Sequence, residues 1–153
     1  MIKSIKSKLP NTYYWDTSAL LTLIFDESGS DSLRKWVSRE GALPGYSSFF
    51  TQIEVESALF RRMEEGSLGG AMGSVRAALT ELHSQMAYVW ADSSILTQAK
   101  RCAIEYGLRP GDSLQLATAL EIATELKQIF FITLDKKLTK CAQAAGLTVP
   151  SIF

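Results

Sequence analysis

Strand-like and helix-like patterns alternate along this chain, and no other feature narrows its fold as much. Short β-prone runs are expected at residues 12–15, 42–46, 87–90, 129–132 and 147–149. Apolar side chains at helical spacing lie between them, at residues 17–25, 30–39, 49–65, 70–85, 93–106, 112–126 and 136–145. Strands that alternate with helices predict an α/β fold, with a mostly parallel sheet covered by helices on both faces. Ligands bind such a sheet at the carboxyl ends of its strands.

Length and composition indicate one domain. The chain has 153 residues, so residues 1–11 are interpreted as an N-terminal extension and residues 12–153 as a single domain. No apolar run is long enough to span a bilayer, and the first residues lack the apolar core of a secretory signal. A cytoplasmic location with no membrane partner is therefore expected. Cys102 and Cys141 lack metal-ligand spacing and are expected to be free thiols.

Several aromatic and apolar residues are expected to be inside the fold. The helix at residues 49–65 is predicted to bury one stripe, made of Phe49, Ile53, Phe60 and Met63. Trp36, Tyr46 and Trp90 are expected in the core or at an edge of the sheet, and His83 is expected to serve packing or the surface.

The charge balance counts mildly against a nucleic-acid partner. Sixteen basic and sixteen acidic residues give a formal net charge of zero, whereas nucleic-acid binders are usually basic. Acidic residues gathered around a cation would leave the rest of the surface more basic than this sum.

Acidic residues follow two of the expected strands. Asp16 comes at the end of the first strand and Asp135 just beyond the strand at residues 129–132. Each precedes a helix, so either one alone could be a structural helix cap.

Two further acids change this balance. Glu54 lies in the apolar stretch of its helix, and its competitor Glu56 points about 200° away from it around the helix axis. Asp112 opens another helix, where capping is again the structural alternative. If all four acids converge, their repulsion requires a cation, and an all-carboxylate site suits Mg²⁺ or Mn²⁺ better than zinc. Spacing alone does not establish that convergence.

Four segments resemble the motifs of the PIN-domain family, especially its VapC-like toxins. These are residues 16–20 (DTSAL), 51–59 (TQIEVESAL), 107–120 (GLRPGDSLQLATAL) and 131–138 (FITLDKKL). The match runs in order over about residues 13–149. The resemblance implies a three-layer α/β/α fold with a five-stranded parallel sheet, in which the first and fourth strands are neighbours. Gln115 departs from the family, since many relatives have a histidine at this position.

The resemblance also implies a function. It implies a metal-dependent endoribonuclease that leaves a 5′-phosphate and a 3′-hydroxyl, the toxin of a toxin–antitoxin pair, with an antitoxin partner and a homodimeric state. The expected site residues are the catalytic and metal-binding acids Asp16, Glu54, Asp112 and Asp135, the orienting hydroxyls Thr17, Ser18 and Thr133, and the substrate-binding candidates Arg109, Lys136, Lys137, Arg61 and Arg62.

Other functions fit the sequence less well. A haloacid-dehalogenase-type phosphatase needs a second aspartate where this chain has Ser18, and a dinucleotide enzyme needs a glycine-rich turn after the first strand. For Arg61 and Arg62 a solvated helix face is the structural alternative. The principal alternative is a PIN-like module that binds RNA or a protein partner without cutting.

Overall fold

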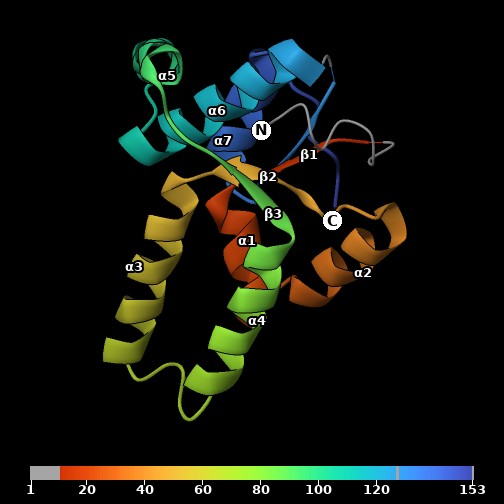
Figure 1. Cartoon of the computed structure of the whole chain (residues 1–153), viewed down its shortest axis with the longest axis vertical. Coiled ribbons are helices and arrows are strands. Elements are labelled where there is room, and N and C mark those ends of the chain that lie inside the picture. Colours follow the sequence, from red (N-terminus) through yellow and green to blue (C-terminus); the bar gives the residue numbers. More distant parts are fainter. Residues whose placement is uncertain (1–10, 127, 153) are drawn as a thin grey trace.

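A parallel sheet lies at the centre of the fold (Figure 1). The computed structural model describes residues 11–126 and 128–152, and in that part of the chain the sheet has four strands in the order β3-β2-β1-β4. They are β1 (Tyr13–Trp15), β2 (Gly45–Ser48), β3 (Met86–Val89) and β4 (Phe130–Ile132). All are paired in parallel, and β1 lies beside β4 as expected. Apart from Asn11, the expected N-terminal extension lies outside the described residues.

The expectation of five strands is wrong for the part of the chain that is described. Residues 147–149 form only a single parallel bridge, between Phe130 and Thr148. The N–H of Phe131 donates to the carbonyl of Thr148 at 2.8 Å. Pro150 follows two residues after Thr148, and it has no N–H with which to extend the β-ladder.

The second strand begins later than predicted. It starts at Gly45 rather than at residue 42, because Pro44 cannot donate to a ladder inside a sheet. The glycine is needed at this position, since a Cβ atom on Gly45 would lie 2.8 Å from Cδ1 of Trp15. The strand β2 ends at Ser48, and the next helix begins two residues later, at the carboxyl edge of the sheet.

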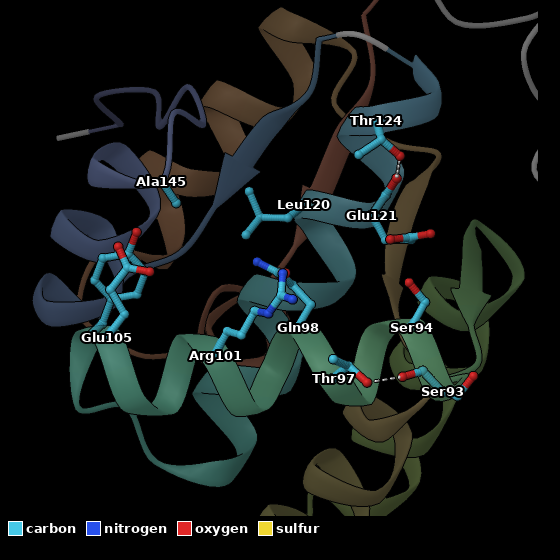
Figure 2. Close-up of a pocket in the computed structure, with 11 residues that line it drawn as sticks. Ser93, Ser94, Thr97, Gln98, Arg101, Glu105, Leu120, Glu121, Thr124 and Ala145 are labelled. Carbon is cyan, nitrogen blue, oxygen red and sulfur yellow. Dashed lines mark hydrogen bonds between the residues drawn. The ribbon is translucent and has the colours of Figure 1, made fainter.

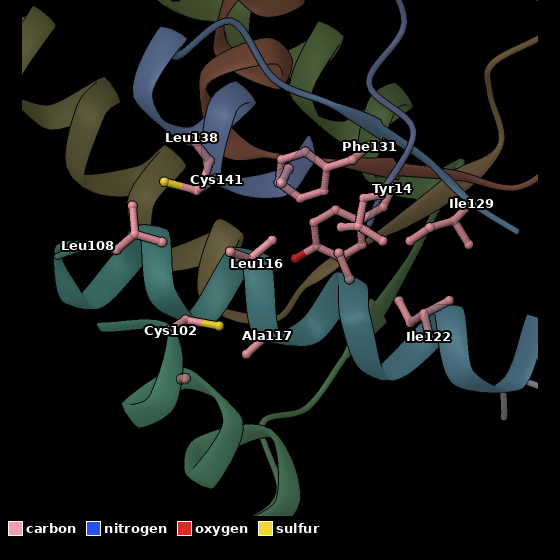
Figure 3. Close-up of a cluster of buried hydrophobic side chains, with 14 of the residues drawn as sticks. Tyr14, Cys102, Leu108, Leu116, Ala117, Ile122, Ile129, Phe131, Leu138 and Cys141 are labelled. Carbon is pink, nitrogen blue, oxygen red and sulfur yellow. The ribbon is translucent and has the colours of Figure 1, made fainter. Parts of the chain in front are cut away.

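Helices cover both faces of the sheet, which confirms the three-layer arrangement. They are α1 (Thr17–Ile24), α2 (Ser30–Glu40), α3 (Phe50–Glu64), α4 (Met72–Ser84), α5 (Ser93–Tyr106), α6 (Pro110–Leu126) and α7 (Lys136–Ala144). The core between the sheet and α5, α6 and α7 is shown in Figure 3. A second core lies between the sheet and α1, α2 and α4.

Successive side chains of β1 and β4 point to opposite faces of the sheet, so both strands contribute residues to both cores. Tyr14 and Phe131 point to the face covered by α6, and their rings stack with centroids 5.4 Å apart. Tyr13, Trp15 and Ile132 point to the opposite face. Paired residues of parallel strands project on the same side, so the register that pairs Tyr14 with Phe131 aligns the strand ends as well.

The inward face predicted for α3 is wrong. Ile53, Phe60 and Met63 are 57%, 59% and 46% exposed, and Phe49 is half-buried. The buried side chains are instead Thr51, Val55, Ala58 and Leu59. Ala58 and Leu59 pack in a third cluster with residues of α1 and α4. The buried stripe of α3 is therefore the one that contains Val55 and Leu59.

Other expectations hold. Cys102 and Cys141 are buried and free, and Trp36 and Tyr46 are buried in the two cores. His83 is half-buried and hydrogen-bonds through Nδ1 to the hydroxyl of Tyr88. Among the described residues, every helix is too short or too polar to traverse a lipid bilayer.

Candidate active site

The four acids predicted from the sequence line one pocket at the carboxyl ends of the strands. The pocket has a volume of about 350 Å³. It is lined by Asp16, Thr17, Ser18, Leu21, Phe50, Ile53, Glu54, Ser57, Arg61, Arg109, Asp112 and Asp135. Segments that are far apart in the sequence therefore meet where a doubly wound sheet usually binds its ligand.

Asp16 follows β1 directly and is held from both neighbouring turns. Its N–H donates to the carbonyl of Ile132 at 2.9 Å, which extends the pairing of β1 with β4 by one residue. Its Oδ2 accepts hydrogen bonds from the hydroxyl of Ser18 at 2.6 Å and that of Thr133 at 2.9 Å. The same carboxylate caps α1 by accepting from the N–H of Ser18. Asp16 is thus a helix cap that also lines the pocket.

Burial makes the negative charge of Asp16 costly. The residue is 5% exposed, and this burial raises the pKa of Asp16 to about 6. Hydrogen bonds from Ser18 and Thr133 lower the pKa, whereas the charge of Glu54 raises it further. A buried carboxylate beside a second one is a place where a cation binds favourably.

Ser18 and Thr133 join the two turns that carry Asp16 and Asp135. The hydroxyl of Ser18 accepts from the N–H of Leu134 at 3.1 Å while it donates to Asp16. Thr133 likewise accepts from the N–H of Asp135 at 3.2 Å. These hydroxyls, expected to orient the acids, also connect the turn after β1 to the turn after β4.

Glu54 is fixed by a buried polar network. Its Oε2 accepts from the hydroxyl of Thr17 and, at 2.9 Å, from the side-chain amide of Gln115. Gln115 is only 1% exposed, and its Oε1 accepts from the hydroxyl of Tyr14 at 2.6 Å. Burial raises the pKa of Tyr14 well above its usual range, so this phenol remains a donor. The donor role of Tyr14 directs the amide nitrogen of Gln115 toward Glu54.

The competitor Glu56 is excluded from the pocket. It faces the other side of α3 and pairs with Nη1 of Arg76 at 2.6 and 2.8 Å. Glu54 is the acid of this helix that reaches the site, as the sequence pattern favoured.

Asp112 and Asp135 enter the pocket from two helices. Asp112 is the third residue of α6, so its expected alternative role as the N-cap is wrong. Its Oδ2 pairs with Nε of Arg109 at 3.1 Å. Asp135 does cap α7, because its Oδ1 accepts from the N–H of Leu138 at 2.7 Å.

The basic candidates divide into two groups. Arg61 and Arg109 line the pocket, and Arg61 donates to the hydroxyl of Ser57 at 3.0 Å. Arg62 is turned away, with its guanidinium paired to Glu27 and placed 4.1 Å from the centroid of Phe25.

The two lysines stand outside the set of described residues that line the pocket. Lys136 is exposed at the start of α7. Lys137 donates from Nζ to the carbonyl of Gly107 at 2.6 Å. Arg61 and Arg109 are therefore the better placed cations for a bound phosphate.

The four carboxylates have the donor chemistry of a site for a hard cation. Asp16, Glu54, Asp112 and Asp135 each use one oxygen in the contacts above, and within residues 11–126 and 128–152 the second oxygen of each makes no hydrogen bond to protein. Oxygen-only sites suit Mg²⁺ and Mn²⁺. In the same described residues, no three acidic, cysteine or histidine side chains already stand in an arrangement that could hold a metal ion. Binding a cation here requires side-chain movement.

A larger cavity, of about 670 Å³, lies elsewhere, between α5 and α6 (Figure 2). Figure 2 shows Gln98 and Arg101 of α5 facing Leu120 and Glu121 of α6. Asp16, Glu54, Asp112 and Asp135 are all absent from its described lining. Its size therefore does not make it the better candidate for chemistry.

Sequence reasoning missed two positions in the site. Gln115 was noted only as a departure from the family, although its amide supports Glu54. Gly111 was not noticed, yet a Cβ atom there would lie 2.9 Å from Oε1 of Glu54 and 3.1 Å from Cε1 of Phe50. The glycine in the RPGDS segment was the available signal for the close approach of Glu54 to α6.

Comparison with known proteins gives consistent matches. Residues 13–144 match the family model of the PIN domain. Proteins named ribonuclease VapC35 from two strains of Mycobacterium tuberculosis are each 28% identical over 136 residues, which cover 89% of this chain and 93% of the relative.

A solved structure described as a toxin–antitoxin complex from Klebsiella pneumoniae contains a similar chain. It superposes with a TM-score of 0.62 at 19% identity, over 93% of this chain and 98% of that chain. At this level of identity the likeness concerns the fold.

Proposed function

This chain belongs to the PIN-domain family, and from that premise we propose that it is an endoribonuclease that hydrolyses RNA phosphodiester bonds with Mg²⁺ or Mn²⁺. One observation carries the proposal. Asp16, Glu54, Asp112 and Asp135 come from separate segments and line a single pocket at the carboxyl edge of the sheet. The names of the mycobacterial relatives support ribonuclease activity.

The four acids would hold one or two cations through the oxygens that make no hydrogen bond to the described protein. When bound, such a cation supplies an activated water and offsets the charge that builds up on the phosphate and on the leaving oxygen. Asp16 is the central ligand in this proposal, because it is the most buried of the four and is fixed by Ser18 and Thr133.

The remaining groups have positioning roles. Gln115 and Thr17 keep one oxygen of Glu54 engaged, so that the other faces the pocket. Arg109 is paired with Asp112 only at the surface, where its side chain is 80% exposed. An exposed ion pair of this kind is weak, so Arg109 is able to exchange the carboxylate for a substrate phosphate. That exchange would also free Asp112 for the cation.

The test compares two glutamates of one helix. Purified wild-type protein is incubated with structured and unstructured RNAs in Mg²⁺, in Mn²⁺ and in EDTA, beside Asp16→Asn, Glu54→Gln and the matched control Glu56→Gln. Cleavage should require metal and fall by about 100-fold or more in Asp16→Asn and Glu54→Gln. Glu56→Gln should cut at the wild-type rate, because Glu56 pairs with Arg76 outside the pocket. Equal cleavage by Glu54→Gln and Glu56→Gln would refute the assignment.

The second candidate function is a PIN-like module that binds RNA without cutting it. The zero net charge favours neither function. Metal-independent RNA binding, with no cleavage of any RNA in Mg²⁺ or Mn²⁺, would establish this alternative.

The cellular role proposed is that of the toxin in a toxin–antitoxin pair. The names of the relatives support it, and so does the likeness in fold to a chain of the Klebsiella pneumoniae toxin–antitoxin complex. Its partners would be an RNA substrate, a cognate antitoxin protein and a second copy of the chain in a homodimer. Induced expression in bacteria should arrest growth with the wild type and not with Asp16→Asn. Light scattering of the purified protein tests the proposed homodimer.

A further inference from the structure

An aromatic pair, the exposed Trp90 and the half-buried Phe49, lies on the same edge of the sheet as the acidic pocket. Trp90 follows β3 directly and is 64% exposed. One face of its indole stacks on Phe49, with ring centroids 3.6 Å apart and an angle of 17° between the planes. Trp90 is thus a supported, flat and largely solvent-exposed surface, where the sequence had indicated a core or edge residue.

The backbone connects this pair to the pocket. The N–H of Phe49 donates to the carbonyl of Val89 at 2.9 Å, which joins the start of α3 to the end of β3. The next residue, Phe50, lines the pocket, and so does the exposed Ile53 one turn later. Trp90, Phe49, Phe50 and Ile53 form a strip that links Trp90, through the first turn of α3, to the lining of the pocket.

The distance along the edge suits a nucleic-acid strand. Two strand spacings separate β3 from β1, which Asp16 follows directly, and this corresponds to about 10 Å. An extended chain of one or two nucleotides spans such a distance. Arg61, about two turns after Ile53 on α3, lines the same pocket, where a phosphate backbone needs a cation.

We propose that Trp90, supported by Phe49, is a stacking platform for an unpaired RNA base that flanks the phosphate held in the acidic pocket. The inference rests on the proposed function and specifies the substrate as locally single-stranded, because only an unstacked base can lie on the indole. Aromatic side chains beside a cationic groove are the usual means of holding single strands, and stacking accepts any base.

A protein partner is the other possible occupant of an exposed aromatic surface. The observations favour RNA, because the strip is continuous with the pocket that would hold a phosphate. The largest exposed apolar residues on the rest of α3, Phe60 and Met63, lie farther along the helix, outside the described lining of that pocket.

Intrinsic fluorescence tests the platform selectively. Of the three tryptophans, Trp15 is 0% and Trp36 6% exposed, so Trp90 is the one that a ligand can reach. Full-length protein in EDTA, which prevents cleavage, is titrated with the hexamer r(A)₆ and with a hexamer of abasic phosphodiester units. Saturable quenching by r(A)₆, and little by the abasic hexamer, is expected.

Variants measure the contribution of the ring. Anisotropy of labelled r(A)₆ should give a Kd raised about tenfold in Trp90→Ala, in line with base–aromatic stacking. The Kd should stay within about threefold of wild type in Trp90→Phe. The matched control is Ile104→Ala on α5, which removes a 76% exposed apolar side chain away from the strip and should leave the Kd unchanged. Unchanged melting temperatures would show that all three variants are folded.

The outcomes test the stacking platform independently of the proposed nuclease activity. An unchanged Kd in Trp90→Ala, or equal quenching by the abasic hexamer, overturns the platform even if the protein cuts RNA. Quenching and a weakened Trp90→Ala support it even if the protein never cuts. If a co-purified protein shields Trp90 from acrylamide and r(A)₆ does not, the surface is a protein interface and the proposal is overturned.

Discussion

The side-chain nitrogen of Gln115 lies 2.9 Å from Oε2 of Glu54, deep between α6 and α3. On its other side, the amide oxygen of Gln115 accepts from Tyr14. A neutral residue inside the core therefore sets the direction in which a carboxylate faces the pocket. Among residues 11–126 and 128–152, the groups that orient Glu54 are neutral, so none of them would compete with a bound cation.

Replacing Gln115 should loosen Glu54. In Gln115→Leu the carboxylate loses a donor and the buried hydroxyl of Tyr14 loses its acceptor, which costs on the order of 2 kcal/mol of stability. Affinity for Mn²⁺ and the cleavage rate should each fall about tenfold or more. Calorimetric titration with Mn²⁺ measures the metal affinity without any substrate. Gln115→His, which can again donate to Glu54, should recover most of both, and a histidine variant no better than leucine would contradict the positioning role.

A single methyl group at Gly111 should disturb the site. In Gly111→Ala the new Cβ would meet Oε1 of Glu54 and the ring of Phe50, so the carboxylate must move. We expect cleavage to drop strongly while the melting temperature changes little. The control is Gly73→Ala in α4, where nothing lies within 4 Å and alanine favours the helix by about 1 kcal/mol. Normal cleavage by Gly111→Ala would show that Glu54 has room to shift.

Asp16→Asn should stabilise the metal-free protein at neutral pH. The pKa of Asp16 is raised from 3.8 to about 6 in the folded chain, so the charge opposes folding fully above pH 6 and not at all below about pH 4. A shift of this size corresponds to about 2 to 3 kcal/mol at pH 7.5, a gain of several degrees in melting temperature. The gain should shrink as pH falls through this window. Melting curves of the wild type and Asp16→Asn in EDTA at pH 4, 6 and 7.5 test this prediction. Equal melting temperatures of the two proteins at pH 7.5 would contradict it.

Two of the three arginines considered as phosphate ligands, Arg109 and Arg62, should behave differently. Arg109→Gln should raise KM for RNA several-fold and reduce the salt dependence of binding, because Arg109 lines the pocket. Arg62→Gln should instead lower the melting temperature, since Arg62 pairs with Glu27 and covers Phe25. Steady-state kinetics and thermal melts of both variants give the comparison. A larger KM effect from Arg62→Gln would reverse the assignment.

The sheet and the strand-end acids were predictable because they follow from local patterns. Runs such as residues 129–132 have strong β-propensity, and parallel pairing places whatever follows each strand on one edge. Asp16 and Asp135 could be located on that edge without any structure. The last strand could not, because whether residues 147–149 form a ladder depends on pairing beyond Phe130.

The buried face of α3 could not be predicted from hydrophobicity. Two stripes fit the helical period, one with Ile53, Phe60 and Met63, the other with Val55 and Leu59. The larger side chains of the first stripe favour its burial, but packing against α1 and α4 buries the second stripe. Gln115 was missed for a related reason, since a polar residue in a helix reveals its role only through partners distant in sequence.

The hydroxyl of Ser18 connects the turn after β1 with the turn after β4, and the carboxylate of Asp16 depends on both. Asp16 and Asp135, two of the four acids, thus lie in the turns that follow the neighbouring strands β1 and β4, near their paired ends. Moving these two acids apart would require β1 and β4 to separate, and residues of both strands lie in the cores on the two faces of the sheet. A molecule that inhibits this protein by covering the pocket would therefore leave the backbone of these turns in place, so that its release requires only side-chain movement and no refolding.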